Sequence, residues 1–190
     1  MLRNFKHGWL SRFACDRRGV SAVEFAFIAP VMIGLYLGCA EISDGVAADR
    51  KVSLIADTLA NLGAQVTSIS NAQMTNILDA SSAIIAPYSA SNLQMKLSCI
   101  KIDSTGVAKV QWGASRNTTA RAHNDVYTFP SGSSALAVPG SWLLLAEVSY
   151  AYTPTIGYTI SGSLTLSDKM YMAPRISAPS YGDAPAVGCT

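Results

Sequence analysis

The chain has 190 residues, of which 49% are hydrophobic and only 14% are charged. Soluble domains carry about 25% charged residues, so this composition favours a membrane or exported protein and excludes a disordered chain. Residues 1–19 hold five basic residues and one acidic residue, a net charge of +4, whereas the rest holds nine basic and eleven acidic residues, a net charge of −2. Because the main part of the chain is acidic, we expect no nucleic-acid partner.

An apolar segment, residues 20–40, follows the basic leader of residues 1–19 and contains one charged residue, Glu24. As a helix rising 1.5 Å per residue it would span about 30 Å, which is the hydrocarbon thickness of a bilayer. Basic residues favour the cytoplasmic side of a membrane. We therefore expect a single-pass protein with its N-terminus inside and membrane lipid as a partner. In a bacterium this means an inner-membrane protein with a periplasmic C-terminal part.

Four export pathways fit parts of this segment, and the sequence leaves them open. A signal anchor would keep the chain whole, and a signal peptide would be cut after Ala40. A lipoprotein would be modified at Cys39, and a twin-arginine signal would use Arg17 and Arg18. None of the four explains Glu24, because a carboxylate inside a bilayer costs several kcal/mol unless it is protonated, paired or able to reach the interface.

The residues around Glu24 suggest a fifth pathway. Residues 17–19 read Arg-Arg-Gly, and the next six read VSAVEF, with Glu24 as the fifth and Phe25 as the sixth. This pattern resembles the prepilin-peptidase site of type IV pilins, most closely that of the tight-adherence (Tad/Flp) branch. The resemblance implies cleavage between Gly19 and Val20. It also implies a role for Glu24 and Phe25 in subunit assembly, with Glu24 pairing with the free amine of Val20 on a neighbouring subunit.

Small residues recur at four-residue steps along the same segment. Gly34 and Gly38 form a Gly-x-x-x-Gly motif, and Ala22, Ala26 and Pro30 precede it at the same interval. Small residues at this spacing let two helices approach closely in lipid, although glycine and alanine are also common in any spanning helix. We expect Gly34 and Gly38 to contact another helix.

The helical pattern continues over residues 41–90. Apolar residues recur there at spacings of three, four or six, and predict a stalk helix through Ile42, Val46, Val52, Ile55, Leu59 and Leu62. We expect Asp44-Gly45 to loosen this helix and Gly63 to end it. Ser70-Asn71 is a possible cap for a second helix, which Pro87 would end.

From residue 91 the hydrophobic period changes to two. The alternation predicts strands over residues 93–99, 108–112, 144–152 and 164–172, with a turn at residues 103–106 and a polar, exposed loop at residues 114–124. Glu147 is expected on the less buried face of its strand. Residues 91–190 are therefore expected to form a head of about four antiparallel strands against the helices, and the fold class is α+β.

The head extends the resemblance. The run from Leu143 to Tyr152, the following Thr153-Pro154, and residues 164–175 with a near-terminal cysteine are similar to TadE/TadG-like proteins. This implies a minor pilin-like subunit or assembly factor, in the inner membrane or the extracellular pilus. Its implied partners are other Tad pilin-like subunits, the inner-membrane assembly platform and prepilin peptidase. The alternative is an uncleaved, membrane-anchored periplasmic scaffold or binding protein.

The expected topology sorts the four cysteines. Cys15 falls in the leader and Cys39 in the apolar segment, so Cys99 and Cys189 are the two that would lie outside. Two lone cysteines in one exported domain usually form a disulfide. Closing a loop of this length would contribute about 4 kcal/mol by restricting the unfolded chain. The alternative is a pair of reduced, buried thiols.

We expect no catalytic residue, metal or cofactor. His123 is the one histidine outside the leader, which is too few for a histidine-rich metal site, and its loop position with Asp125 indicates a solvated residue. Ser98 and Lys101 match the Ser-x-x-Lys motif of penicillin-binding enzymes, but strand alternation places them on opposite faces. An exported hydrolase of unfamiliar type is the remaining enzymatic alternative. Core packing or an adhesive surface would account for the late tyrosines Tyr150, Tyr152, Tyr158, Tyr171 and Tyr181.

Overall fold

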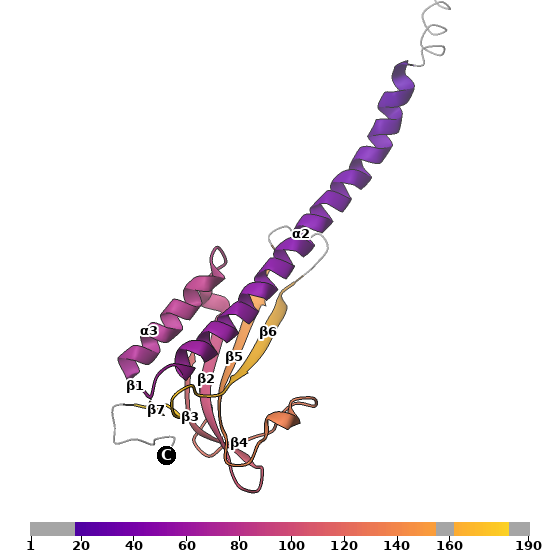
Figure 1. Cartoon of the computed structure of the whole chain (residues 1–190). Helices are drawn as coiled ribbons and strands as arrows, with labels where there is room; N and C mark the ends of the chain where they lie inside the picture. The colour runs from indigo at the N-terminus through magenta and orange to yellow at the C-terminus, as the bar shows by residue number, and fades with distance from the viewer. Residues whose placement is uncertain (1–17, 155–161, 183–190) are drawn as a thin grey trace, which may run out of the picture.

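The computed structural model describes residues 18–154 and 162–182. A single long helix, α2 (Arg18–Ala64), begins the described chain. Its first half projects from the molecule and its second half lies on a head built from a sheet and a shorter helix, α3 (Asn71–Ser82) (Figure 1). The expected α+β architecture, a long apolar helix followed by an antiparallel sheet, is confirmed.

The sheet has five strands in the order β4-β3-β2-β5-β6, and all neighbouring pairs are antiparallel. The strands are β2 (Leu93–Ile102), β3 (Ala108–Arg116), β4 (Val126–Tyr127), β5 (Trp142–Tyr152) and β6 (Leu164–Met172). The four expected strands are present, and the additional one, β4, has only two residues. A strand this short shows no alternation, so the sequence carried no signal for it.

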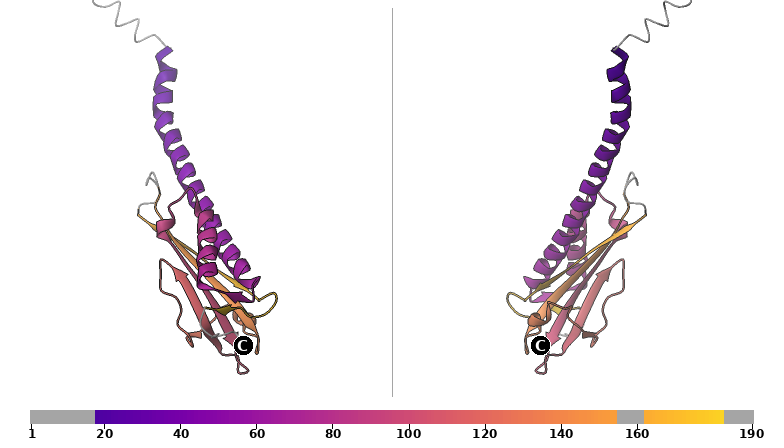
Figure 2. Two further views of the ribbon diagram at one scale, coloured as in Figure 1. Left: turned by 90° about the vertical axis from the view of Figure 1, so that its left-hand side faces the viewer. Right: turned by 90° about the vertical axis from the view of Figure 1, so that its right-hand side faces the viewer.

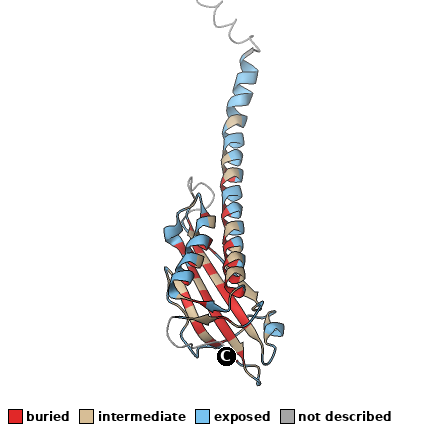
Figure 3. Cartoon of the chain, turned by 60° about the vertical axis from the view of Figure 1, so that its left-hand side comes forward, coloured by how far each residue is buried: buried red, intermediate tan, exposed pale blue. Residues whose placement is uncertain are grey.

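Both helices cover the same face of the sheet (Figure 2). The main core lies between them and the sheet, and it appears as the red bands along the strands and along the lower half of α2 (Figure 3). Alternate strand residues supply one side of this core and helix residues the other, including Val52, Ile55, Leu59, Leu97, Leu144, Ala146, Val148, Tyr150 and Tyr152. The predicted apolar face of β5 is therefore confirmed.

A smaller core lies on the opposite face of the sheet. It contains Ile100, Val110 and Leu145, with Tyr127 and Phe129 packed over them. The rings of Tyr127 and Phe129 meet edge to face with their centroids 5.2 Å apart. The short helix η3 (Ser134–Leu136) follows in the same connection between β4 and β5. Strand β4 and this connection thus cover one end of the face that the helices leave open.

The chain after β6 returns to the end of α2. Strand β7 (Ser180–Tyr181) pairs in parallel with β1 (Ser68–Ile69). The buried Trp112 side chain donates a hydrogen bond of 2.7 Å from Nε1 to the carbonyl of Pro179, and its ring lies 5.2 Å from that of Tyr181. These contacts fasten the late segment to the sheet.

Helix α3 begins where its cap was predicted. Ser70 Oγ accepts a hydrogen bond of 3.2 Å from the backbone N–H of Gln73, and Gln73 Oε1 accepts one of 2.9 Å from the N–H of Ser70. This reciprocal capping box satisfies two N–H groups that a helix start leaves open. The helix ends at Ser82 and continues into η1 (Ala83–Ile85), before Pro87; η2 (Ala90–Asn92) then leads into the sheet.

One expectation for the stalk is wrong. Helix α2 passes through Asp44-Gly45 without a break, because Gly45 is buried next to the ring of Tyr152. Ile42 and Val46 are 54% and 47% exposed, whereas Glu41, Gly45 and Ala48 face the head. At this level Gly45 and Ala48 allow the helix backbone to approach the sheet and Ile42 and Val46 lie outside the contact, whereas Val52, Ile55 and Leu59 further along the helix lie within it.

The prediction of a polar, exposed loop at residues 114–124 is also partly wrong. Strand β3 continues to Arg116, and Arg121, which was expected to be exposed, is partly buried against Glu147. An arginine reads as a solvated residue in the sequence, but here its charge is paired with an acid 26 positions away, which no local pattern shows.

The tyrosines pack inside the head where the structure describes them. Tyr150 and Tyr152 are buried in the main core, and Tyr171 Oη lies 2.6 Å from Tyr127 Oη. Tyr181 stacks on Trp112, and Tyr158 lies outside the described residues. Core packing therefore accounts for Tyr150 and Tyr152, and an adhesive surface made of these two residues is excluded.

Candidate functional site: the exposed apolar half of helix α2

The outer half of α2, residues 19–40, exposes large apolar side chains around the helix. Phe25 is 71% exposed, Phe27 76% and Tyr36 73%. Within the described residues one helix, α2, is long and apolar enough to cross a membrane, and no residue of its most apolar window is buried. A helix that is apolar on all sides is stable when lipid or other protein surrounds it. This half is therefore consistent with membrane anchoring.

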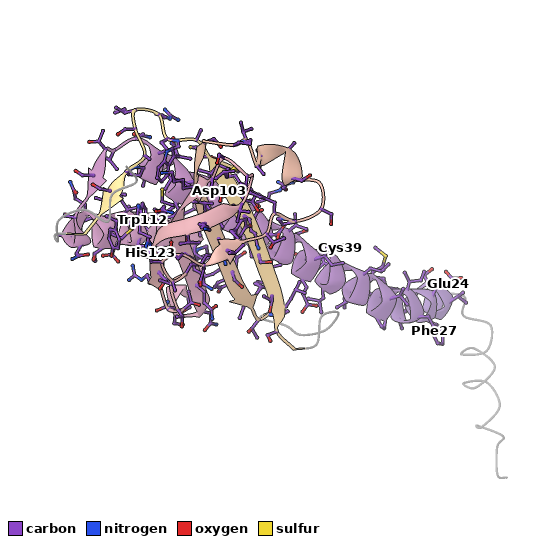
Figure 4. The ribbon with its side chains drawn as sticks, turned by 90° about the horizontal axis from the view of Figure 1, so that it is seen from below. Glu24, Phe27, Cys39, Asp103, Trp112 and His123 are labelled. Carbon is purple, nitrogen blue, oxygen red and sulfur yellow. The ribbon has the colours of Figure 1, made fainter. Side chains whose placement is uncertain are left out.

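The residues expected to direct processing and assembly lie at the tip of this half. Gly19 and Val20 are in the first turns of α2 and are exposed. Glu24 follows one helical turn after Val20, is also exposed, and lies near the free end of the helix beside Phe27 (Figure 4). The fold thus presents the carboxylate on the surface of the apolar rod, far from the head.

The two glycines of the packing motif lie along a shallow apolar groove on one side of α2. The groove runs from Pro30 to Ile42 and includes Gly34 and Gly38. A second apolar groove begins at Ile42 and lies between α2 and strand β6, where Leu164 and Leu166 line it. The contact of Gly34 and Gly38 with another helix stays a prediction, since a single chain cannot test it.

The inner half of α2, residues 41–64, is fixed to the head by close packing. A Cβ atom built on Gly63 would lie 3.0 Å from Leu97 Cδ2, so the last turn of the helix rests directly on strand β2. Gly63 is the penultimate helix residue, one position before the end of α2, and it serves this close approach as well as the helix end.

Polar contacts hold the middle of α2 to the segment after α3. Lys51 Nζ donates to the carbonyl of Ile84 over 3.2 Å, and Tyr88 Oη donates to the carbonyl of Asp44 over 3.1 Å. Burial and the nearby Asp44 carboxylate raise the pKa of Tyr88. The Tyr88 ring also meets that of Tyr152 edge to face at 5.9 Å. The outer half is therefore carried by a helix whose base is firmly attached.

The two cysteines within the described residues differ in their exposure to solvent. Cys39 is exposed and is the free cysteine of the described residues. Cys99 is fully buried in β2. Cys15 and Cys189 lie outside the described residues. The Cys99–Cys189 disulfide accordingly stays a prediction.

The residues considered for chemistry are dispersed. Ser98 is completely buried in β2, opposite Gly113 and Leu145, and Lys101 lies over the ring of Trp142 at 4.7 Å. The strand prediction for this segment is confirmed. His123 is exposed, and its Nδ1 lies 2.7 Å from the carbonyl of Gln111. Within residues 18–154 and 162–182, no group of three or more His, Cys, Asp or Glu side chains is placed to hold a metal ion.

Comparison with protein families bears on the same helix. Residues 19–58 match the TadE-like protein family. The matched region begins at Gly19 and ends inside the inner half of α2, so it contains both Glu24 and the first residues that pack on the head. The resemblance stated from the sequence is confirmed for this TadE-like helix, and it is consistent with a Tad pilus-associated protein. No curated protein and no solved structure matches the chain.

Sequence reasoning missed a charged cluster on the open face of the sheet. Arg121 Nε and Nη2 donate to Glu147 Oε2 and Oε1 over 2.7 and 2.9 Å, and Lys169 Nζ lies 3.0 Å from Oε1. Burial alone would raise the pKa of Glu147, but the hydrogen bonds from Arg121 and Lys169 outweigh it and lower this pKa. The sequence offered one sign of this cluster: the alternation along β5 places Glu147 on the face of the strand opposite to Ala146 and Val148.

Proposed function

We propose that the protein is a pilin-like minor subunit or assembly factor of a Tad/Flp pilus. The observation that carries this proposal is the TadE-like match over residues 19–58, on a helix whose outer half is apolar and exposed. In this proposal the chain is exported with its N-terminus in the cytoplasm and its head in the periplasm. It resides in the bacterial inner membrane, with membrane lipid around residues 20–40, and prepilin peptidase cuts it between Gly19 and Val20.

Glu24 would set the register between neighbouring subunits. Cleavage after Gly19 would leave a free amine on Val20, one helical turn from Glu24. A carboxylate and an ammonium group are each costly in lipid, and pairing between two subunits neutralises both. The exposed position of Glu24 on the described helix leaves its side chain accessible to such a neighbour.

The head would act as the part that primes, caps or presents the pilus. Its sheet and helices form a core that does not depend on the outer half of α2. We include in the proposal a Cys99–Cys189 disulfide, which would tie the end of the chain to strand β2. The partners would be other Tad pilin-like subunits and the inner-membrane assembly platform. The role would be non-catalytic and would need no cofactor and no nucleic acid.

The first experiment is the intact mass and N-terminal sequence of the protein isolated from native membranes and from sheared pili. The proposal expects a chain that begins at Val20, and Gly19→Val should abolish this product because it replaces the glycine of the proposed cleavage site with a branched residue. A native chain that begins at Met1 would favour the uncleaved, anchored scaffold. A start at Cys39 or Glu41 would contradict the pilin pathway.

A second experiment separates assembly from anchoring. Glu24→Gln keeps the size of the side chain and removes its charge, and we expect it to reduce piliation at least tenfold while the protein stays in the membrane. Asp44→Asn is the matched control, since Asp44 is an exposed acid on the same helix beyond the apolar segment. Equal piliation in the two variants would argue against the proposed role of Glu24.

A further inference from the structure

The open face of the sheet, opposite the two helices, carries two rows of polar side chains. Each row crosses strands β2, β5 and β6 at paired positions: Lys96, Glu147 and Lys169 form the first, and Gln94, Ser149 and Ser167 form the second. The six residues of the two rows line a cavity of about 170 Å³, together with Thr118. We call this cavity the Lys96 pocket. Its volume exceeds the roughly 30 Å³ that one water occupies, so a small ligand group fits.

The glutamate in the middle of the first row does not neutralise Lys96. Both oxygens of Glu147 already accept hydrogen bonds from Arg121, and Lys169 adds a second cation at 3.0 Å. Among the described residues, none of the ion pairs includes Lys96. A lysine stem can lie on a sheet at little cost, but its ammonium group keeps a strong preference for an anion or water.

The charges around the Lys96 pocket leave an excess of positive charge. On this face Lys96, Arg121 and Lys169 contribute three cations against the carboxylate of Glu147, a net charge of +2, whereas Asp168 borders the pocket from a position paired with Val148, on the face that the helices cover. Asp168 accepts a hydrogen bond of 2.7 Å from the backbone N–H of Lys169. The second row adds neutral donors, namely the hydroxyls of two serines and the amide of a glutamine. Ammonium groups beside hydroxyl and amide donors are the usual partners of carboxylate and phosphate oxygens.

We propose that the Lys96 pocket binds a compact oxyanion, either a phosphate or a carboxylate group, with Lys96 as its main charged contact. Lys169 stands on the other side of the same row, and Arg121 keeps the Glu147 carboxylate occupied. The site lies on the head, away from the TadE-like helix, and does not depend on the proposed pilus role.

The test is a calorimetric titration of the full chain, held in detergent micelles, with sodium phosphate and separately with sodium succinate at constant ionic strength. We expect saturable binding of at least one of these two ions; phosphate alone would identify a phosphoryl ligand, and succinate alone a carboxylate. Lys96→Met should weaken binding about tenfold or more, as expected for the loss of a charged hydrogen bond. Higher sodium chloride should also weaken it.

A matched control variant and a stability measurement guard the interpretation. Lys109→Met removes an exposed lysine of strand β3 that does not line the pocket, and should leave the affinity within about twofold. The proposal is overturned if neither ion binds saturably, or if Lys109→Met weakens binding as much as Lys96→Met does. Lys96 makes no ion pair with another described residue, so thermal unfolding of Lys96→Met should match that of the unmodified chain.

Discussion

The two halves of helix α2 have similar residues and opposite surroundings. In the outer half Phe25, Phe27 and Tyr36 are more than 70% exposed, whereas in the inner half Val52, Ile55 and Leu59 are completely buried. One uninterrupted helix therefore passes from a segment with no covering protein to a segment that forms half of a core. The difference shows that hydrophobicity alone does not select the packing face. In the inner half the small residues Gly45, Ala48 and Gly63 lie on the same buried side as Val52, Ile55 and Leu59 and allow the helix to approach the sheet closely.

The largest expected effect comes from shortening one isoleucine in each half. Ile55→Ala removes a fully buried side chain and should lower the free energy of unfolding of the head by about 2–5 kcal/mol. Ile33→Ala makes the same change where the side chain is 59% exposed, and should alter this free energy by less than about 0.5 kcal/mol. Urea unfolding of the full chain in detergent micelles, followed by tryptophan fluorescence, measures both.

Equal destabilisation by the two variants would break the comparison, because it would mean that the outer half also packs on the head. A larger destabilisation by Ile33→Ala than by Ile55→Ala would mean that the outer half, and not the inner half, contributes to the core. Membrane association gives the complementary readout, since neither variant should release the chain from lipid.

Acid should act on the head and leave the outer half helical. The pKa of Glu147 is lowered from 4.5 in the folded chain, so its pairing stabilises the fold above about pH 4.5, and this contribution is lost as the pH falls through the folded value. Arg121→Met removes two charged hydrogen bonds and should lower the free energy of unfolding by about 2 kcal/mol at neutral pH. It should also raise the Glu147 pKa, so that the loss begins at higher pH.

Glu147→Gln supplies the control for this acid effect. The variant has no carboxyl group at this position. Below about pH 4.5, its free energy of unfolding should therefore lack the decrease that protonation of Glu147 causes in the unmodified chain. An unchanged acid profile in Glu147→Gln would assign the loss to other carboxylates. Helicity by circular dichroism should fall only partly in acid, because the outer half carries no part of this cluster.

Two glycines of the inner half should respond with opposite signs. Gly63→Ala places a methyl group 3.0 Å from Leu97 and should destabilise the head by about 1–2 kcal/mol. Gly45→Ala meets an ordinary contact, 3.8 Å from Tyr152 Cε1, and gains helix propensity, so it should stabilise by about 0.5–1 kcal/mol. Thermal unfolding distinguishes these outcomes. A stabilised Gly63→Ala would show that the last turn of α2 does not rest on β2.

The sequence predicted the elements that are long enough to repeat their hydrophobic pattern several times. The apolar helix, the capped start of α3 at Ser70 and the strands around Leu97, Leu144 and Leu166 all have enough residues for alternation or helical spacing to emerge. The spacing predicted the helix through Ile42 and Val46 but not which of its residues contact the head, because the sheet that it packs on is formed by residues far along the chain.

The candidate site divides in the same way. Glu24 and its neighbours could be found from sequence because their spacing along a single helix is local, and the matched region begins at Gly19. The group formed by Arg121, Glu147 and Lys169 joins a loop and two strands, so only strand register brings it together. Lys96 belongs to the same row through its pairing with Glu147, a relation that no spacing in the chain reveals.

The smallest expected effect tests how α3 is held beside the inner half of α2. Ser70→Ala removes the side-chain acceptor for the N–H of Gln73 and should destabilise the head by about 1 kcal/mol. Thr75→Ala, on the exposed side of the same helix, loses only a hydroxyl that donates to the carbonyl of Asn71, and should be neutral or slightly stabilising because alanine favours helix. Urea unfolding resolves the difference. If both variants behaved alike, the start of α3 would depend on packing of Met74 and Leu78 against the core instead of on its cap.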